Sequence, residues 1–180
     1  KIAKIVESRV EVFMTDPKLP SGTDRVASIL THFPTVSKVV NFQADEPFLP
    51  PEHIENLIEK MPSWADVGTL IYPMAKENFD NPNSIKVVIS KNNEALYFSR
   101  LGIPFNSDSK WHHLGIYAYT RSAIQRFVSF PVDEIETSEK LEQLRGLRNG
   151  LRYFALPCNC ENNEINTPED LEHVRTKFKL

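Results

Sequence analysis

The sequence predicts an α/β fold built around a mixed, mostly parallel β-sheet. Apolar segments of strand length alternate along the chain with segments of helical periodicity, which is the pattern of an α/β layer structure. Residues 36–42 are mostly apolar, as a strand covered on both faces is expected to be. The strands predicted between residues 67 and 120 are not separated by long helices, so part of the sheet is expected to be antiparallel. The 180 residues are enough for one domain with a sizeable core, and we treat residues 1–180 as a single domain.

The first residues of the chain have the pattern of a helix that is already under way. Residues 1–8 have the spacing of the last turns of an amphipathic helix, and residues 10–14 predict a buried strand. A helix that leads into a strand implies an earlier strand in an α/β fold. We therefore expect the chain to hold roughly the C-terminal two thirds of a larger fold, whose N-terminal part is absent from it.

Two helices and a strand are predicted next. Ser21 or Thr23 can cap a helix over residues 21–33, and a strand follows over residues 36–42. Two consecutive prolines then precede Glu52, where the next helix is expected to begin, because proline is tolerated in the first helical turn.

The second half of the chain continues the alternation. Asparagine tolerates positive φ, so the pair Asn92-Asn93 predicts a hairpin turn. Thr167 and the proline after it form a strong helix start. The remaining strands are predicted at residues 67–74, 85–90, 95–99, 114–120 and 152–157, and the remaining helices at residues 122–129, 134–149 and 167–179.

The composition excludes several classes of protein. Lys and Arg number 21 and Asp and Glu number 24, giving a formal charge of −3, which argues against a nucleic-acid binder. No apolar run approaches the roughly 20 residues that a membrane-spanning helix needs. Cys158 and Cys160 cannot make a disulfide framework and are only half a zinc site, so we expect free thiols in a soluble cytoplasmic protein. The pair His112-His113 also lacks a helical partner for a metal.

Polar side chains follow the strand predicted at residues 36–42. Gln43, Asp45 and Glu46 come directly after it, and ligands in open α/β sheets bind beyond the carboxyl ends of the strands. The two carboxylates suit a hard cation such as Mg²⁺. The alternative is a solvated turn before the next helix.

Three further segments carry candidate binding groups, each with a purely structural alternative. The string Ser21-Gly22-Thr23-Asp24-Arg25 offers hydroxyls and backbone N–H groups at a helix start, where the alternative is simple N-capping. Arg100 ends a strand and can bind a carboxylate, or it can form a surface ion pair. Glu142 and Gln143 lie in a predicted helix whose leucines face the core, so they belong to a ligand site or to a charged outer face.

Together these segments resemble one family. The strings SGTDR, QADEP, ALYFSR, HLGIY, LEQLR and NTPEDLE occur in the order and approximate spacing of the 3-deoxy-manno-octulosonate (Kdo) cytidylyltransferases, the CMP-Kdo synthetases. The resemblance covers the chain from Glu11 to its end and implies a three-layer, Rossmann-like nucleotidyltransferase. The family's basic loop for the CTP triphosphate belongs to a segment that this chain does not include.

The resemblance implies an activity and a set of site residues. CTP and Kdo would give CMP-Kdo and pyrophosphate with Mg²⁺ as cofactor, for lipopolysaccharide biosynthesis in a cytoplasmic homodimer. Asp45 resembles the metal-binding carboxylate, and Arg25 and Arg100 resemble the basic groups around the sugar acid; the resemblance implies that all three serve catalysis. The substrate-binding positions that the resemblance implies are Ser21 and Thr23 beside the cytidine, and Gln43, His113, Tyr117, Glu142 and Gln143 around the sugar.

The sequence also departs from the family pattern. Asn166 stands where the family usually has a second metal-binding Asp, which removes a negative charge that Glu164 can supply instead. Ala44 replaces a family Gly at a tight point beside the ligand. Two alternatives therefore stay open: a catalytically impaired paralogue that still binds a sugar acid, and a nucleotidyltransferase for a related sugar acid, such as an amino-substituted one.

Overall fold

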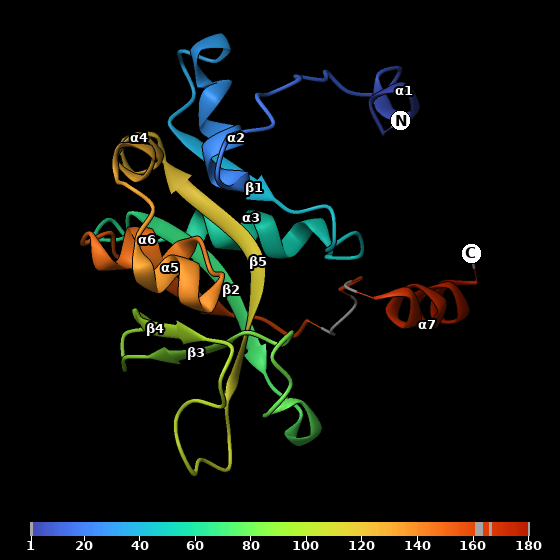
Figure 1. Ribbon diagram of the computed structural model, residues 1–180, viewed down its shortest axis with the longest axis vertical. Helices are drawn as coiled ribbons and strands as arrows, with labels where there is room; N and C mark the ends of the chain where they lie inside the picture. The colour runs from blue at the N-terminus through green and yellow to red at the C-terminus, as the bar shows by residue number, and fades with distance from the viewer. Residues whose placement is uncertain (1, 161–163, 166, 180) are drawn as a thin grey trace.

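The computed structural model describes residues 2–160, 164, 165 and 167–179, and its centre is a six-stranded sheet (Figure 1). Five strands follow the order β4-β3-β5-β2-β6, and β1 pairs with β5. β1 lies beside the C-terminal half of β5, and β3 lies beside its N-terminal end on the same edge. The strands are β1 (Lys38–Phe42), β2 (Val67–Pro73), β3 (Lys86–Ile89), β4 (Ala95–Ser99), β5 (Trp111–Thr120) and β6 (Tyr153–Pro157).

The sheet is mixed, as predicted, but its neighbour pairs are mostly antiparallel. Four of the five pairings among the described strands are antiparallel, and only β2 and β6 pair in parallel. The reason is the central position of β5, which runs against β1, β2 and β3. β1, β2 and β6 still run in one direction, so their carboxyl ends meet at one edge. The expectation of a mostly parallel sheet is therefore wrong, while the α/β class is confirmed.

Helices cover both faces of the sheet and make three layers (Figure 1). Leu57 of α3 is fully buried against one face, and Ile124 and Phe127 of α4 and Leu144 of α6 are buried against the other. The helices are α1 (Ile2–Val6), α2 (Gly22–Ser28), α3 (Pro51–Lys60), α4 (Arg121–Ser129), α5 (Glu134–Glu139), α6 (Gln143–Arg148) and α7 (Pro168–Phe178), with short 3-10 turns at Leu30–His32 and Lys76–Asn78. No helix in the described part of the chain is long and apolar enough to cross a bilayer.

Local signals explain most of the element boundaries. The Ser21 hydroxyl caps α2 by accepting from the Asp24 backbone N–H, and Thr167 caps α7 in a capping box with Asp170. Asn93 has a φ of 59° in the turn that joins β3 and β4, which confirms the hairpin predicted there.

Three predicted elements differ in the structure. The helix predicted over residues 21–33 ends at Ser28, and a 3-10 turn follows it at Leu30–His32. Residues 10–14 form no strand: Val10 and Met14 are 58% and 86% exposed, because this segment lies away from the sheet and pairs with no strand (Figure 1). The helix predicted over residues 134–149 is broken into α5 and α6, because Lys140 takes the left-handed conformation (φ 54°) that ends α5. The break turns Glu142 and Gln143 toward the sheet edge.

Candidate active site

A cavity of about 720 Å³ opens at the carboxyl end of β1, between the loop after that strand and helices α5 and α6. This is the edge at which ligands bind in open α/β sheets. Arg100, at the end of β4, and Gly115 of β5 complete the lining on the sheet side. Eight of the site residues that the resemblance implies line this one cavity: Ser21, Gln43, Asp45, Arg100, His113, Tyr117, Glu142 and Gln143.

Two polar atoms of this cavity are buried without a partner. Within the described part of the chain, Asp45 Oδ1 and Gln143 Nε2 are inaccessible to solvent and form no hydrogen bond. Gln143 is only 2% exposed. Burying an unpaired polar atom costs about 1–3 kcal/mol, so such atoms are uncommon in native proteins unless a ligand completes them. Their presence in one cavity indicates a site that is built to bind.

Thr23 lies beneath the cavity and positions Glu142. The Thr23 hydroxyl donates to Glu142 Oε1 (2.7 Å), and the Thr23 backbone N–H donates to Glu142 Oε2 (3.2 Å). Asn41 of β1 donates to the same hydroxyl (3.1 Å). Thr23 is fully buried, so it holds the carboxylate that lines the cavity and does not line it itself.

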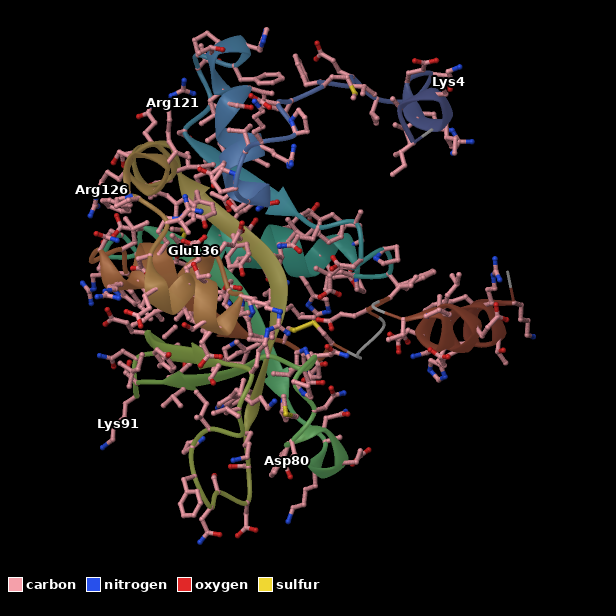
Figure 2. All side chains as sticks on the ribbon, in the orientation of Figure 1. Lys4, Asp80, Lys91, Arg121, Arg126 and Glu136 are labelled. Atoms are coloured by element: carbon pink, nitrogen blue, oxygen red, sulfur yellow. A yellow bond between two sulfur atoms is a disulfide. The ribbon has the colours of Figure 1, made fainter. Side chains whose placement is uncertain are left out.

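Arg145 joins the three helices around the cavity. Its guanidinium donates to both carboxylate oxygens of Glu136 (2.8 Å each) and to both of Asp24 (3.0 and 3.2 Å). Burial alone would lower the pKa of Arg145, but the hydrogen bonds that it donates to Glu136 and Asp24 outweigh this effect and raise that pKa above its usual value. Figure 2 shows Glu136 in the body of the protein, beside the sheet. The triad fixes α2, α5 and α6 relative to one another.

Sequence reasoning missed Arg145, although a signal was present. Arg145 lies four residues after the buried Leu141, and residues four apart share one side of a helix. The interpretation of this segment as a charged outer face is wrong, because Gln143 and Arg145 are 2% and 1% exposed.

Two further acidic side chains, Glu46 and Glu164, line the cavity. Burial and the neighbouring Glu164 raise the pKa of Glu46 to about 8, and the Gly115 backbone N–H donates to its Oε1 (3.4 Å). His112 Nε2 lies 3.3 Å from Glu164 Oε1, and burial lowers the pKa of His112 to about 4. With a pKa of about 8, Glu46 is mostly protonated at neutral pH, so a carboxylic acid lies beside Asp45 in the cavity.

His113 is a buried, neutral imidazole. Burial lowers its pKa to about 3, and neighbouring His112 acts in the same direction. Its Nε2 lies 2.9 Å from the Thr69 hydroxyl, which itself donates to the Ile116 carbonyl (2.7 Å). Thr69 must therefore accept from His113, so the proton of the imidazole is on Nε2.

The depressed pKa of His113 predicts acid lability. The unfolded chain takes up a proton at His113 below about pH 6.5, whereas the folded chain does so only near pH 3, so stability falls as the pH drops through this window. His113→Gln keeps an amide group near the position of Nε2 but cannot take up a proton. Between about pH 7.5 and about pH 5, the free energy of unfolding of this variant should fall by about 2 kcal/mol less than that of the parent. Urea unfolding at both pH values measures this difference. His173→Gln is the matched control, because His173 is exposed. If both substitutions changed the pH dependence of the free energy of unfolding equally, a neutral His113 would be contradicted.

Two predicted residues lie elsewhere, and one is not described. Arg25 does not line the cavity: its guanidinium donates to the Thr15 hydroxyl (3.1 Å) and to the carbonyls of Asp16 (3.0 Å) and Pro17 (3.3 Å), so it holds the loop before α2. Thr23 lies one layer below the lining, as described above. Asn166, expected as a metal ligand, lies outside the described residues.

Arg100 lines the cavity but already holds backbone carbonyls. Its Nε donates to Glu139 O (2.8 Å), and its two terminal nitrogens donate to Pro82 O (2.8 Å) and Lys140 O (3.3 Å). In this structure Arg100 therefore fixes the end of α5 beside the cavity.

Comparison with known proteins identifies the family of the chain. The family of cytidylyltransferases matches residues 1–155. A 3-deoxy-manno-octulosonate cytidylyltransferase of Chlorobium limicola is 37% identical over 94% of this chain and 72% of its own length. An 8-amino-3,8-dideoxy-manno-octulosonate cytidylyltransferase of Shewanella woodyi is 40% identical over 94% of this chain and 74% of its own.

Solved structures show the same fold. A CMP:2-keto-3-deoxy-manno-octonic acid synthetase complexed with CTP superposes with a TM-score of 0.89 at 31% identity, covering 99% of this chain and 76% of that one. A 4-diphosphocytidyl-2C-methyl-D-erythritol synthase shares the fold, with a TM-score of 0.63 at 17% identity over 98% of this chain and 75% of its own. The predicted nucleotidyltransferase fold is confirmed. The chain belongs to the cytidylyltransferase family that contains the CMP-Kdo synthetases.

Proposed function

We propose that this chain binds the eight-carbon sugar acid Kdo in the cavity at the end of β1 and transfers CMP to it from CTP. The observation that carries the proposal is the pair of buried atoms Asp45 Oδ1 and Gln143 Nε2 in one cavity, neither of which has a hydrogen-bond partner among the described residues. The hydroxyls of a sugar can accept hydrogen bonds from the Gln143 amide, and a cation can bind the Asp45 carboxylate. Two observations support CTP as the donor of the CMP group: the chain belongs to the cytidylyltransferase family, and a relative was solved in complex with CTP.

The sugar acid would be held by directional hydrogen bonds. Gln43, Tyr117, Glu142 and Gln143 offer both donors and acceptors from different walls of the cavity. Burial raises the pKa of Tyr117 well above its usual value, so its hydroxyl stays protonated as a donor. Glu142 is held by Thr23 and is therefore oriented before a ligand arrives. Ser21 and Thr23 would lie toward the cytidine, where the resemblance places them.

Asp45 would hold the Mg²⁺ that the family uses. The donors present fit this cation, because Oδ1 of Asp45 is unpartnered within the described part of the chain and Glu46 and Glu164 add carboxylate oxygens to the same cavity. When bound, Mg²⁺ neutralises phosphate charge and orients the triphosphate.

The chain's own contribution to the reaction is mostly positioning. The anomeric hydroxyl oxygen attacks the α-phosphorus, the new O–P bond forms as the bond to the β-phosphate oxygen breaks, and pyrophosphate leaves. Residues on both sides of the cavity, Gln43 after β1 and Gln143 at the start of α6, would hold the sugar in line with the phosphate. The buried triad of Arg145 fixes α6, which begins with Gln143, against α2 and α5.

Replacing Gln143 tests the sugar site. Gln143→Ala is expected to lower kcat/KM for Kdo about 10- to 100-fold, since one or two hydrogen bonds to the sugar are lost. The measurement is pyrophosphate release from CTP by the natural protein that contains these residues. Gln125→Ala, on the exposed side of α4, is the matched control and should leave the rate unchanged. Equal rates for both variants would place the sugar elsewhere.

A second candidate substrate is the 8-amino form of the sugar acid. The relative that is named for this sugar is 40% identical. Among the described residues, five acidic and two cationic side chains line the cavity; of the acidic ones, Glu46 is mostly protonated at neutral pH and Glu136 is paired with Arg145. A surplus of carboxylates favours an ammonium group on the ligand. A competition reaction with equal concentrations of the two sugar acids decides between them, because the two CMP-linked products differ in mass. An excess of the CMP-linked amino sugar would favour this candidate over Kdo.

A further inference from the structure

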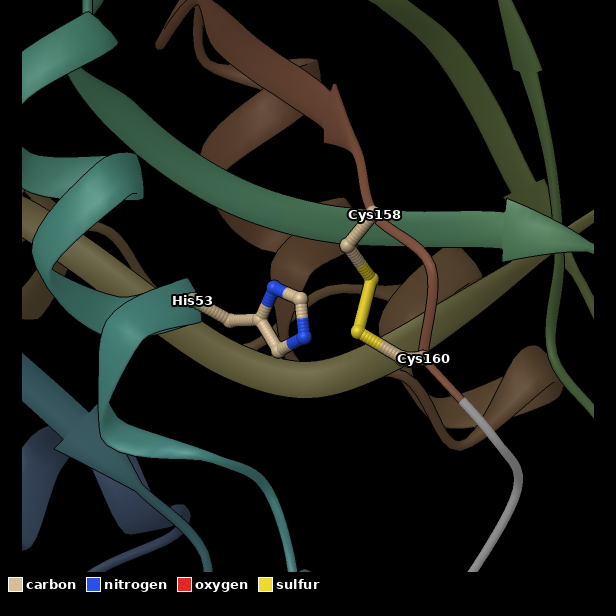
Figure 3. Close-up of side chains that lie close together, drawn as sticks. All are labelled: His53, Cys158 and Cys160. Atoms are coloured by element: carbon tan, nitrogen blue, oxygen red, sulfur yellow. A yellow bond between two sulfur atoms is a disulfide. The ribbon is translucent and has the colours of Figure 1, made fainter.

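Three metal-ligating side chains meet on the α3 side of the sheet, away from the cavity described above. Cys158 and Cys160 follow β6, and His53 lies in the first turn of α3 (Figure 3). One potential ligand atom from each lies within 4.8 Å of the others. Figure 3 shows the imidazole of His53 facing the two sulfur atoms. The segments that carry them are far apart in the sequence, so only the fold brings the three together.

The two sulfurs are joined in a disulfide, which corrects the expectation of free thiols. The sulfurs of a disulfide carry no thiolate charge and are poor metal ligands. Reduction by a dithiol supplies two electrons and two protons: the S–S bond breaks, Cys158 and Cys160 become thiols, and the reductant becomes a disulfide. A divalent ion that binds both sulfurs as thiolates then releases those two protons.

The geometry of the reduced cluster suits zinc. Zn–S and Zn–N bonds of about 2.3 and 2.0 Å in a tetrahedral site place the ligand atoms roughly 3.3–3.8 Å apart, which lies inside the 4.8 Å limit of this cluster. The Cα atoms of Cys158 and Cys160 are 5.4 Å apart, so both sulfurs can reach one ion after a rotation of the side chains. Thiolate and imidazole are the ligands that Zn²⁺ prefers in proteins.

The cluster is also held in place and open on one side. Cys158 is 9% exposed, and its backbone N–H donates to the Ile71 carbonyl of β2 (2.8 Å). The His53 backbone N–H donates to the Pro50 carbonyl (3.0 Å) at the start of α3. A second cavity, of about 310 Å³, is lined by His53, Asn159 and Cys160. It gives an ion an entry path and leaves room for a water molecule as fourth ligand.

We propose that His53, Cys158 and Cys160 form a zinc site when the disulfide is reduced, with an open fourth position. The cysteine pair alone is half of such a site, and the structure supplies His53 as the third ligand. None of its three ligands lines the proposed sugar cavity, although Glu46 borders both cavities.

Metal binding by the oxidised and reduced protein tests the proposal. The protein is reduced with a dithiol, freed of reductant without air, and titrated with Zn²⁺ in competition with a chromophoric chelator. The reduced chain is expected to bind one ion and the oxidised chain none at the same site. Co²⁺ in place of Zn²⁺ should add a thiolate-to-metal absorption band in the reduced form only.

Variants assign the ligands. Loss of an outer-shell partner alone costs about 10- to 100-fold in metal affinity, so His53→Ala and Cys160→Ser should each weaken Zn²⁺ binding at least about 100-fold. His32→Ala, on the 3-10 turn at Leu30–His32, is the matched control and should leave the affinity unchanged. Circular dichroism checks that each variant is folded.

Three results would overturn the proposal. The first is equal zinc binding by the oxidised and reduced parent, a comparison that needs no variant. The second is a His53→Ala protein that binds zinc as tightly as His32→Ala. The third is a folded protein in which thiol titration finds no free thiols after reduction. Because each readout is metal binding or thiol content, failure here leaves the proposed transferase function untouched.

Discussion

Replacing Asp45 by asparagine should lower kcat/KM for CMP transfer about 100-fold or more, because a metal-bound carboxylate supplies about 3 kcal/mol or more of transition-state stabilisation. The substitution keeps the shape of the side chain and removes its charge. Oδ1 of Asp45 has no hydrogen-bond partner within the described part of the chain, so no structural contact of that atom is lost. The measurement is pyrophosphate release by the natural protein over a range of Mg²⁺ concentrations, alongside thermal unfolding.

The combination of the two readouts separates a functional carboxylate from a structural one. If Asp45 binds the metal, the Asp45→Asn protein should unfold at the same temperature as its parent and need more Mg²⁺ to reach half of its maximal rate. Asp108→Asn is the matched control, since Asp108 is exposed and pairs only loosely with Lys76 (3.5 Å). An Asp45→Asn protein that transfers CMP at the parent rate would contradict the role of Asp45.

Replacing Arg145 by methionine should lower the free energy of unfolding by about 3–5 kcal/mol. Arg145 is 1% exposed and neutralises two buried carboxylates, Asp24 and Glu136. Removal of the guanidinium leaves both charges buried without compensation. For a chain of this size the loss corresponds to a decrease of about 6–20 °C in Tm.

Two comparisons test the cause of that loss. Arg148→Met removes an arginine that is half exposed and lies 3.6 Å from Asp133, so it should cost less than about 1 kcal/mol. Adding Asp24→Asn and Glu136→Gln to the Arg145→Met protein removes the two stranded charges and should restore part of the stability. An Arg145→Met protein as stable as the Arg148→Met protein would contradict the account of the triad.

Local patterns predicted the elements, whereas long-range pairing decided the sheet. The caps at Ser21 and Thr167 and the turn at Asn93 depend on neighbours a few residues away, and the structure confirms them. The direction of β5 relative to β1 and β2 depends on which strands meet, and no local signal carries it. Residues 10–14 are apolar enough for a strand but find no sheet edge, so their pattern gave the wrong prediction.

The site could be predicted only in part, for a similar reason. Gln43 and Asp45 could be recognised because they follow an apolar strand. The burial of Arg145 had a local signal, but its ion pairs had none, because one of its carboxylate partners, Asp24, is 121 residues away in the sequence. His53 likewise could not be predicted as a ligand, because only the fold brings the start of α3 close to the end of β6.

The most direct test of the proposed function is pyrophosphate release from CTP by the natural protein that contains these residues, with Mg²⁺ present and with or without Kdo. We predict release that depends on the sugar acid and yields one CMP-Kdo for each pyrophosphate. The Gln143→Ala protein should show this dependence only weakly. A folded protein that binds CTP but releases no more pyrophosphate with Kdo or its 8-amino form than without them would contradict the assignment of the cavity to a sugar acid.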